Sequence, residues 1–138
     1  MIIRSPTGSY LIALPDAAEQ DIDDDVVSYR IAGDDLLLQL SSRSRNDGPY
    51  ASASDLMRRR LDWGYSDVTP VMLDIGACHD VAAASVDEGD GACWLFVYAV
   101  WPSLAVFVTV THPTRDVAEE SWALEAIRSI RLVGYDVD

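Results

Sequence analysis

Two side chains of this sequence, those of Cys93 and His112, could together perform nucleophilic chemistry. A cysteine attacks a substrate as its thiolate, and a neighbouring histidine can remove the thiol proton. If tight turns at 87–91 and 101–103 join the strands around them, Cys93 lies opposite Ser85 on one strand and close to His112 on the other. Because Cys93 falls in an apolar strand face, where cysteine usually acts as a small hydrophobe, this dyad is the alternative and a non-enzymatic protein is the main prediction.

A second group of reactive residue types, Cys78, His79 and Asp80, contains the members of a nucleophilic triad. Neighbours along a strand point to opposite faces, so these side chains cannot converge on one substrate. The same register places Cys78 opposite about Val100, on the order of 20 Å from Cys93 at about 3.3 Å per residue. That separation is far beyond disulfide reach, so we predict two free thiols.

We predict no metal site and no cofactor. The acidic run at 21–25 resembles the start of a calcium-binding loop, but the sixth position holds Val26 instead of glycine and the twelfth holds Ala32 instead of glutamate. His79 and His112 are expected at opposite ends of the strands that carry them, which argues against a shared metal site. The whole segment 16–25 is therefore expected to be a solvated acidic connector.

The charge of the chain narrows the classes of partner. Its 138 residues carry a formal net charge of -13, with 10 basic against 23 acidic residues. Binding to nucleic acid or to an anionic membrane requires clustered cations, so neither is expected. Every basic residue is an arginine, which excludes a Schiff-base lysine and the lysine of a phosphate-binding loop. The one cationic cluster, Arg58–Arg60, spans most of a helical turn and therefore forms no single patch.

The hydropathy of the chain bears on where the protein works. No apolar run reaches the length that spans a membrane. Residues 1–15 are interrupted at Ser5–Gly8 before any long apolar stretch, unlike a signal peptide. We therefore predict a cytoplasmic protein.

Hydrophobic spacing and turn residues predict the elements that must position these side chains. Helical spacing predicts a first helix that starts at Ser52 or Ser54 and ends before Gly64, and a second from Thr114 or Asp116 to about residue 129. Apolar runs and alternation predict a hairpin, a three-stranded meander and further strands, over residues 9–15, 26–32, 36–42, 68–74, 79–86, 92–100, 104–111 and 130–133.

The central strand of the meander is apolar on both faces. Trp94, Phe96 and Tyr98 line one face, while leucine, valine and alanine line the other. A strand with one wet face would alternate apolar and polar residues, so both sides of this sheet must be covered. Either one helix covers each face, or both helices cover one face and a partner covers the other. We predict an α+β single domain over residues 1–138, with an antiparallel β-sheet of about six strands flanked by two main helices.

Four local patterns accompany this order of elements: Leu14-Pro15 at the end of the first strand, the helix from Leu56 to Gly64, Ile75-Gly76 ahead of the meander, and the closing segment Ala126–Leu132. Across nearly the whole chain they resemble the PsbP/Mog1/DcrB-like group. The resemblance implies a Mog1/PsbP-like α/β/α sandwich. It also implies a group whose members mostly bind proteins, as photosystem subunits, a GTPase partner and cytoplasmic chaperones of secreted bacterial effectors.

These observations predict a bacterial protein that binds another protein, as an immunity protein or an effector chaperone does. The partner would lie on the face formed by Trp94, Phe96 and Tyr98, and the acidic surface would attract a basic partner. An apolar face left uncovered would also favour a homodimer.

Trp101, at the turn before Pro102, is the fourth residue predicted to contact the partner. Two orientations of its side chain are open: it folds back onto the sheet, or it projects as an anchor. The alternative function, from a different class, is a small enzyme or ligand carrier that uses Cys93 and His112 beside a pocket in the sheet.

Overall fold

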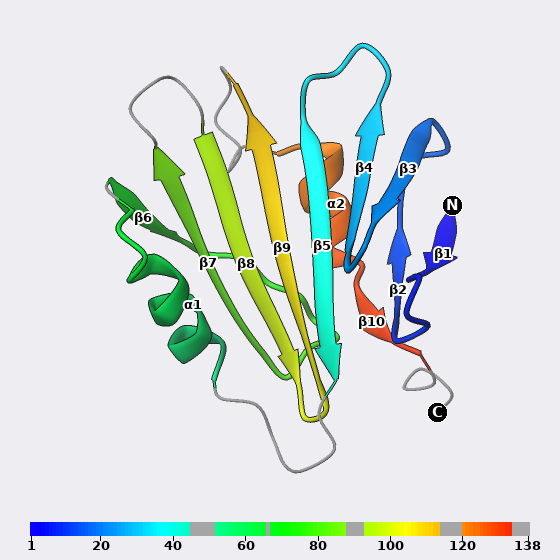
Figure 1. Ribbon diagram of the computed structural model, residues 1–138. Helices are drawn as coiled ribbons and strands as arrows, with labels where there is room; N and C mark the ends of the chain where they lie inside the picture. Colours follow the sequence, from blue (N-terminus) through cyan, green and yellow to red (C-terminus); the bar gives the residue numbers. More distant parts are fainter. Residues whose placement is uncertain (45–51, 66, 88–92, 114–119, 134–138) are drawn as a thin grey trace.

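Two antiparallel sheets and two helices make up the described part of the chain (Figure 1). The structure is a computed structural model that describes residues 1–44, 52–65, 67–87, 93–113 and 120–133. The larger sheet has seven strands in the order β3-β4-β5-β9-β8-β7-β6, and the smaller has three in the order β1-β2-β10. The predicted α+β class and antiparallel sheet are confirmed, with seven strands in place of about six and a second sheet that was not predicted.

Most observed elements lie close to the predicted ranges. The elements are β1 (Ile2–Arg4), β2 (Tyr10–Ala13), β3 (Ala18–Asp23), β4 (Val26–Ile31), β5 (Leu37–Ser44), α1 (Ala53–Leu61), β6 (Val68–Val71), β7 (Asp80–Asp87), β8 (Cys93–Trp101), β9 (Leu104–His112), α2 (Trp122–Arg128) and β10 (Arg131–Leu132).

Among the helices of the described segments, none combines the length and the apolar character needed to cross a bilayer.

The segment predicted as an acidic connector is strand β3. It pairs with β4 in continuous register, from Ala18↔Ile31 to Asp23↔Val26. β3 lies at an edge of the seven-stranded sheet, where exposed charges discourage pairing with another chain. The connector prediction is therefore wrong, because backbone pairing with β4 outweighs the low strand propensity of aspartate.

Two side chains hold the N-terminus of α1. The Ser52 hydroxyl accepts a hydrogen bond from the backbone N–H of Asp55 at 3.1 Å, as an N-cap does. Asp80 of β7 accepts another from the backbone N–H of Ala53 at 2.7 Å. Of the two predicted caps, Ser52 is the one used, and the contact with Asp80 fixes this end of α1 on the sheet.

Helix α2 begins later than predicted. Its cap is Ser121, whose hydroxyl accepts a hydrogen bond from the backbone N–H of Leu124 at 3.3 Å. The predicted caps, Thr114 and Asp116, lie outside the described residues. The helix starts at Trp122 because Ser121 satisfies an N–H group that has no partner within the first turn.

The two helices cover opposite faces of the seven-stranded sheet (Figure 1). We call these sides the α1 face and the α2 face. On the α2 face, helix α2 and the small sheet bury the main hydrophobic core against β4, β5, β8 and β9. On the α1 face, α1 packs on β7 and β8. Of the two arrangements consistent with the sequence, the structure therefore has one helix on each face.

Two buried tyrosines in the main core predict a loss of stability at alkaline pH. Burial raises the pKa of Tyr10, and the nearby Tyr29 raises it further; burial also raises the pKa of Tyr29. Both phenols thus stabilise the fold fully below their unfolded-state pKa of about 10, and progressively less as the pH rises above it. We expect the contribution of these phenols to the free energy of unfolding in urea to stay level to about pH 9 and to fall above about pH 10. Tyr10→Phe should reduce that fall, and an equally steep fall in the variant would contradict this explanation.

Candidate functional site

Helix α1 covers only one end of its face. Met57 and Leu61 of α1 pack against Ala84, Val86 and Phe96 of β7 and β8. Among the described elements, neither helix covers the α1 face of β5, β4 and β3 (Figure 1). We call the uncovered surface from β9 to β3 the open face, and its side chains include Phe107, Thr109, Gln39, Ser41 and Ser28.

Strand register shows how the α1 face changes in character across the sheet. One row of paired residues runs from Phe96 on β8 through Thr109, Gln39 and Ser28 to Asp21 on β3. Directly paired residues point to the same side of a sheet. The row therefore passes from a buried aromatic ring, through a polar floor, to a carboxylate at the edge.

A pocket of about 320 Å³ lies where the open face meets α1. Its floor comes from β5, β8 and β9, and its wall from α1 and the segment after it. This volume is at the lower end of the range for small-molecule sites, which is about 300–1,000 Å³. The lining residues are Val26, Gln39, Leu40, Ser41, Arg60, Tyr65, Trp94, Phe96, Phe107 and Thr109.

Arg60 is the charged side chain among the described residues that line this pocket. Its guanidinium carbon lies 4.2 Å from the ring centroid of Phe107 and 4.6 Å from that of Trp63, and its Nε donates a hydrogen bond to the Tyr98 hydroxyl at 3.3 Å. Contacts with two rings and a hydroxyl hold the guanidinium in place. Within the described residues, no carboxylate lies at ion-pair distance from it.

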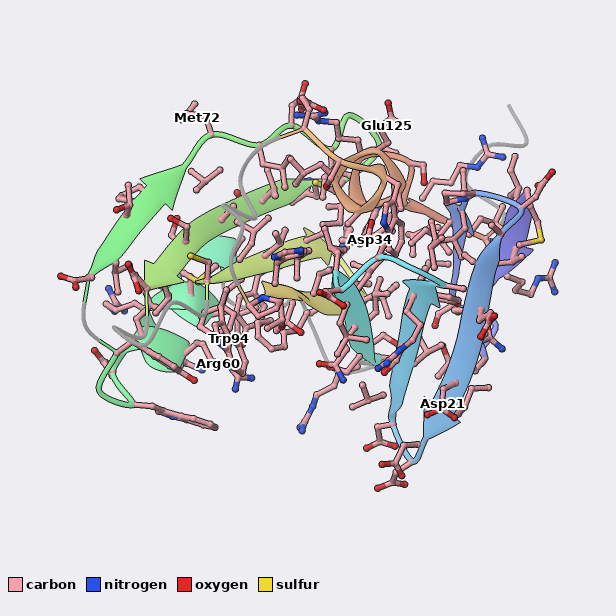
Figure 2. All side chains as sticks on the ribbon, turned by 90° about the horizontal axis from the view of Figure 1, so that it is seen from above. Asp21, Asp34, Arg60, Met72, Trp94 and Glu125 are labelled. Carbon is pink, nitrogen blue, oxygen red and sulfur yellow. The ribbon has the colours of Figure 1, made fainter. Side chains whose placement is uncertain are left out.

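Carboxylates border the far edge of the open face. Glu19, Asp21 and Asp23 alternate along β3, so their side chains share the α1 side, and all three are exposed. Figure 2 shows Arg60 and Trp94 together on the side of the sheet opposite α2, with Asp21 toward the far edge. The open face thus has a cationic end at α1 and an acidic edge along β3, where Arg30 of β4 pairs with Glu19 on the same face.

The aromatic residues predicted to bind a partner differ in accessibility. Trp94 and Tyr98 are half-buried, whereas Phe96 is only 1% exposed. The Phe96 ring contacts those of Tyr65, Trp94 and Phe107, with centroid distances of 5.2, 5.8 and 5.8 Å. Phe96 therefore supports the pocket from below, and of these three aromatic residues Trp94 and Tyr98 are the accessible ones.

Trp101 does not project from the turn. Its side chain is 2% exposed and belongs to the main core, and its Nε1 donates a hydrogen bond to the backbone carbonyl of Ala77 at 2.8 Å. A surface anchor is thus the wrong one of the two predicted orientations. The indole ring folds back because the core takes its apolar surface and Ala77 accepts its one N–H.

The structure brings the two predicted dyad residues together, but it gives Cys93 a different neighbour on β7 from the predicted one. Cys93 pairs directly with His112 across β8 and β9, on the α2 face. On β7, however, Cys93 pairs with Asp87, while Ser85 pairs with Leu95. The predicted register was off by two residues, an error that leaves every side chain on its predicted face.

The other cysteine is a poor candidate nucleophile. Neither Cys78 nor Cys93 is part of a disulfide, which confirms the predicted pair of thiols. Burial raises the pKa of the Cys78 thiol, which donates a hydrogen bond to the backbone carbonyl of Asp80 at 3.4 Å.

In the parts of the chain that the structure describes, no group of His, Cys, Asp and Glu side chains could hold a metal ion.

Arg60 and Phe107 are among the pocket residues that the sequence patterns did not predict. Arg58 and Arg59 are exposed as predicted, and Arg58 pairs with Asp55 at 3.0 Å, but Arg60 turns toward the sheet. Phe107 precedes Thr109 in the alternating pattern of β9, which places both on the α1 face. That alternation was the available signal for Phe107, whereas the direction of Arg60 depends on where α1 lies.

Comparisons with known proteins bear on the fold of this chain and give no information on its function. No protein-family model matches the chain, and no curated protein matches it. The fold is similar to the crystal structure of a protein from Bacteroides thetaiotaomicron, with a TM-score of 0.66 and 17% sequence identity. The match covers 95% of this chain and 47% of that protein, so this chain spans about half its length.

Proposed function

We propose that this chain is a non-enzymatic protein-binding module that holds a basic protein partner against the open face, as a cytoplasmic immunity protein or effector chaperone would. The observation that carries this proposal is the partial cover of the α1 face of the sheet. Helix α1 packs on β7 and β8, while side chains of β9, β5 and β4 beside it form an accessible floor. A surface that combines aromatic side chains at its α1 end with a polar floor suits a protein partner.

Charge supports a basic partner. Glu19, Asp21 and Asp23 lie on the α1 side of the edge strand, next to the polar floor. The whole chain adds to this field, with a formal net charge of -13. Opposite charge speeds encounter and selects among partners, and its contribution weakens with salt. A partner segment rich in arginine or lysine would therefore lie across β3 and β4.

The resemblance to the PsbP/Mog1/DcrB-like group supports the same reading. An antiparallel sheet between helices is the layer order of the Mog1/PsbP-like sandwich, and most members of that group bind proteins. In this chain the small sheet β1-β2-β10 joins α2 on its side of the core. Membership of the group is part of the proposal, and a homodimer through the open face is its competing outcome.

The test pairs the full chain with the protein encoded beside its gene and measures Kd by calorimetry. We expect Kd to rise at least about tenfold between low and high salt. Asp21→Lys should weaken binding at least about tenfold, because it reverses a charge on the open face. Glu125→Lys makes the same change of net charge on α2, on the opposite side (Figure 2), and should leave Kd within about twofold.

Three results would contradict the proposal. The first is no binding by that protein, and the second is a Kd that is independent of salt. The third is an equal effect of the two lysine substitutions, since a partner on the open face would distinguish Asp21 from Glu125. Analytical sedimentation of the chain without a partner tests for the homodimer, which would show an apparent mass that rises with protein concentration.

A second candidate function rests on the cross-strand pair of Cys93 and His112. Their direct pairing on one face is the arrangement that a thiol nucleophile and its base require. If the pair is catalytic, Cys93 in the native protein should react with iodoacetamide at least about tenfold faster than Cys78, whose pKa is raised by burial. His112→Ala should remove that difference. Equal rates at the two cysteines would exclude the enzyme.

A further inference from the structure

We infer that the pocket beside Arg60 binds a planar aromatic group that carries one carboxylate. This inference concerns a small ligand or a single terminal residue, and it does not depend on the basic partner proposed above. The pocket has room for such a group, with a volume of about 320 Å³. A larger ligand would have to extend onto the open face.

The first argument is the state of Arg60. In the described residues of a chain with 23 acidic side chains, this half-buried arginine has no carboxylate partner. Its neighbour Arg58 pairs with Asp55, so carboxylates are within reach of this helix. Arg60 instead rests against Phe107 and Trp63, and among the described residues an acceptor lies at its Nε alone, the Tyr98 hydroxyl. The two Nη groups remain as donors for a ligand.

The geometry of these donors selects the acceptor. A guanidinium binds a carboxylate through two parallel hydrogen bonds, which is stronger and more specific than a bond to a neutral oxygen. A phosphate offers similar oxygens but carries about two negative charges. One arginine inside a chain of net charge -13 compensates a single charge better than two. A monoanionic carboxylate therefore fits this pocket better than a phosphate.

The walls of the pocket define the rest of the ligand. Trp94, Phe107 and Tyr65 present aromatic surface, which stacks on planar rings in offset or edge-to-face contacts. Gln39 and Thr109 add hydrogen-bonding groups on the floor. An aromatic ring would lie among these side chains with its carboxylate directed to Arg60.

The experiment measures binding of indole-3-acetate and of its neutral amide to the full chain by calorimetry. The acid should bind at least about tenfold more tightly than the amide, and phenyl phosphate should bind more weakly than the acid. Arg60→Gln should weaken binding of the acid at least about tenfold, and Arg60→Lys should restore only part of it. Arg59→Gln, an exposed neighbour on the same helix, should stay within about twofold of the wild type.

A second variant keeps the test independent of the folding of the arginine variants. Thr109→Phe fills the pocket from the floor with Arg60 intact, and it should also weaken binding at least about tenfold. Equal binding of acid and amide, tighter binding of phenyl phosphate, or wild-type binding by Arg60→Gln or Thr109→Phe would overturn the inference, as would no binding of the acid.

The same experiment, repeated with a peptide, shows whether the carboxylate belongs to a protein C-terminus or to a small molecule. A Gly-Gly-Trp peptide that binds as tightly as the free acid, and loses binding when its terminus is amidated, identifies a protein C-terminus. Binding of the free acid alone identifies a small molecule. Both results support the assigned chemistry, and neither depends on the test with Asp21→Lys.

Discussion

Replacing Phe96 with alanine should lower the free energy of unfolding by about 3–5 kcal/mol. The ring is 1% exposed and lies against Tyr65, Trp94 and Phe107, so its removal leaves a cavity that these rings cannot close without moving. Native domains are stable by only about 5–15 kcal/mol, so this loss is a large fraction of the total. Guanidinium denaturation followed by circular dichroism measures it.

The matched control for this change is Phe96→Leu. Leucine keeps most of the buried volume and should cost less than about 1.5 kcal/mol. A loss below about 1 kcal/mol for Phe96→Ala would mean that the ring is not enclosed. The site beneath α1 would then lack the rigid floor that positions Trp94 and Phe107.

Replacing Trp101 with alanine should have an effect of similar size, about 3–5 kcal/mol, although the residue lies at the end of a strand. The side chain is 2% exposed in the main core, and its indole N–H is bound to the carbonyl of Ala77. Trp101→Phe keeps the apolar bulk and loses this hydrogen bond, so it should cost about 1–2 kcal/mol. Thermal and chemical denaturation of both variants measure these losses.

Trp63 provides the contrast, because its side chain is 73% exposed and contacts Arg60. Trp63→Ala should cost no more than about 1 kcal/mol, the size of an exposed cation–π contact. If Trp101→Ala were as mild as Trp63→Ala, Trp101 would be the projecting residue that the structure excludes. Loss of partner binding without loss of stability in Trp101→Ala would support the same conclusion.

Local patterning predicted much of the fold. Runs and alternation located β4, β5, β7, β8 and β9, and the position of Ser52 located the start of α1. These signals work because burial on one side of a strand or helix repeats with a fixed period along the chain. The acidic strand β3 carries no such signal, since its side chains are exposed at a sheet edge.

The candidate site was predicted in part. The face of Trp94, Phe96 and Tyr98 is the face beside the pocket, because alternation along one strand decides which residues share a side. The local pattern could not predict which of these side chains are accessible, because their accessibility depends on how far α1 extends over the sheet. For the same reason Arg60 was grouped with Arg58 and Arg59, which remain in solvent.

The sequence by itself determined the elements, the apolar character of both faces of β8, and the excess of negative charge. Each depends on residues near one another in the chain. Only the tertiary structure decided that one helix covers each face, that Trp101 is buried, and that Arg60 lies against Phe107 at the rim of a pocket. Those outcomes depend on contacts between residues far apart in sequence, and their geometry is set when the helices pack on the sheet.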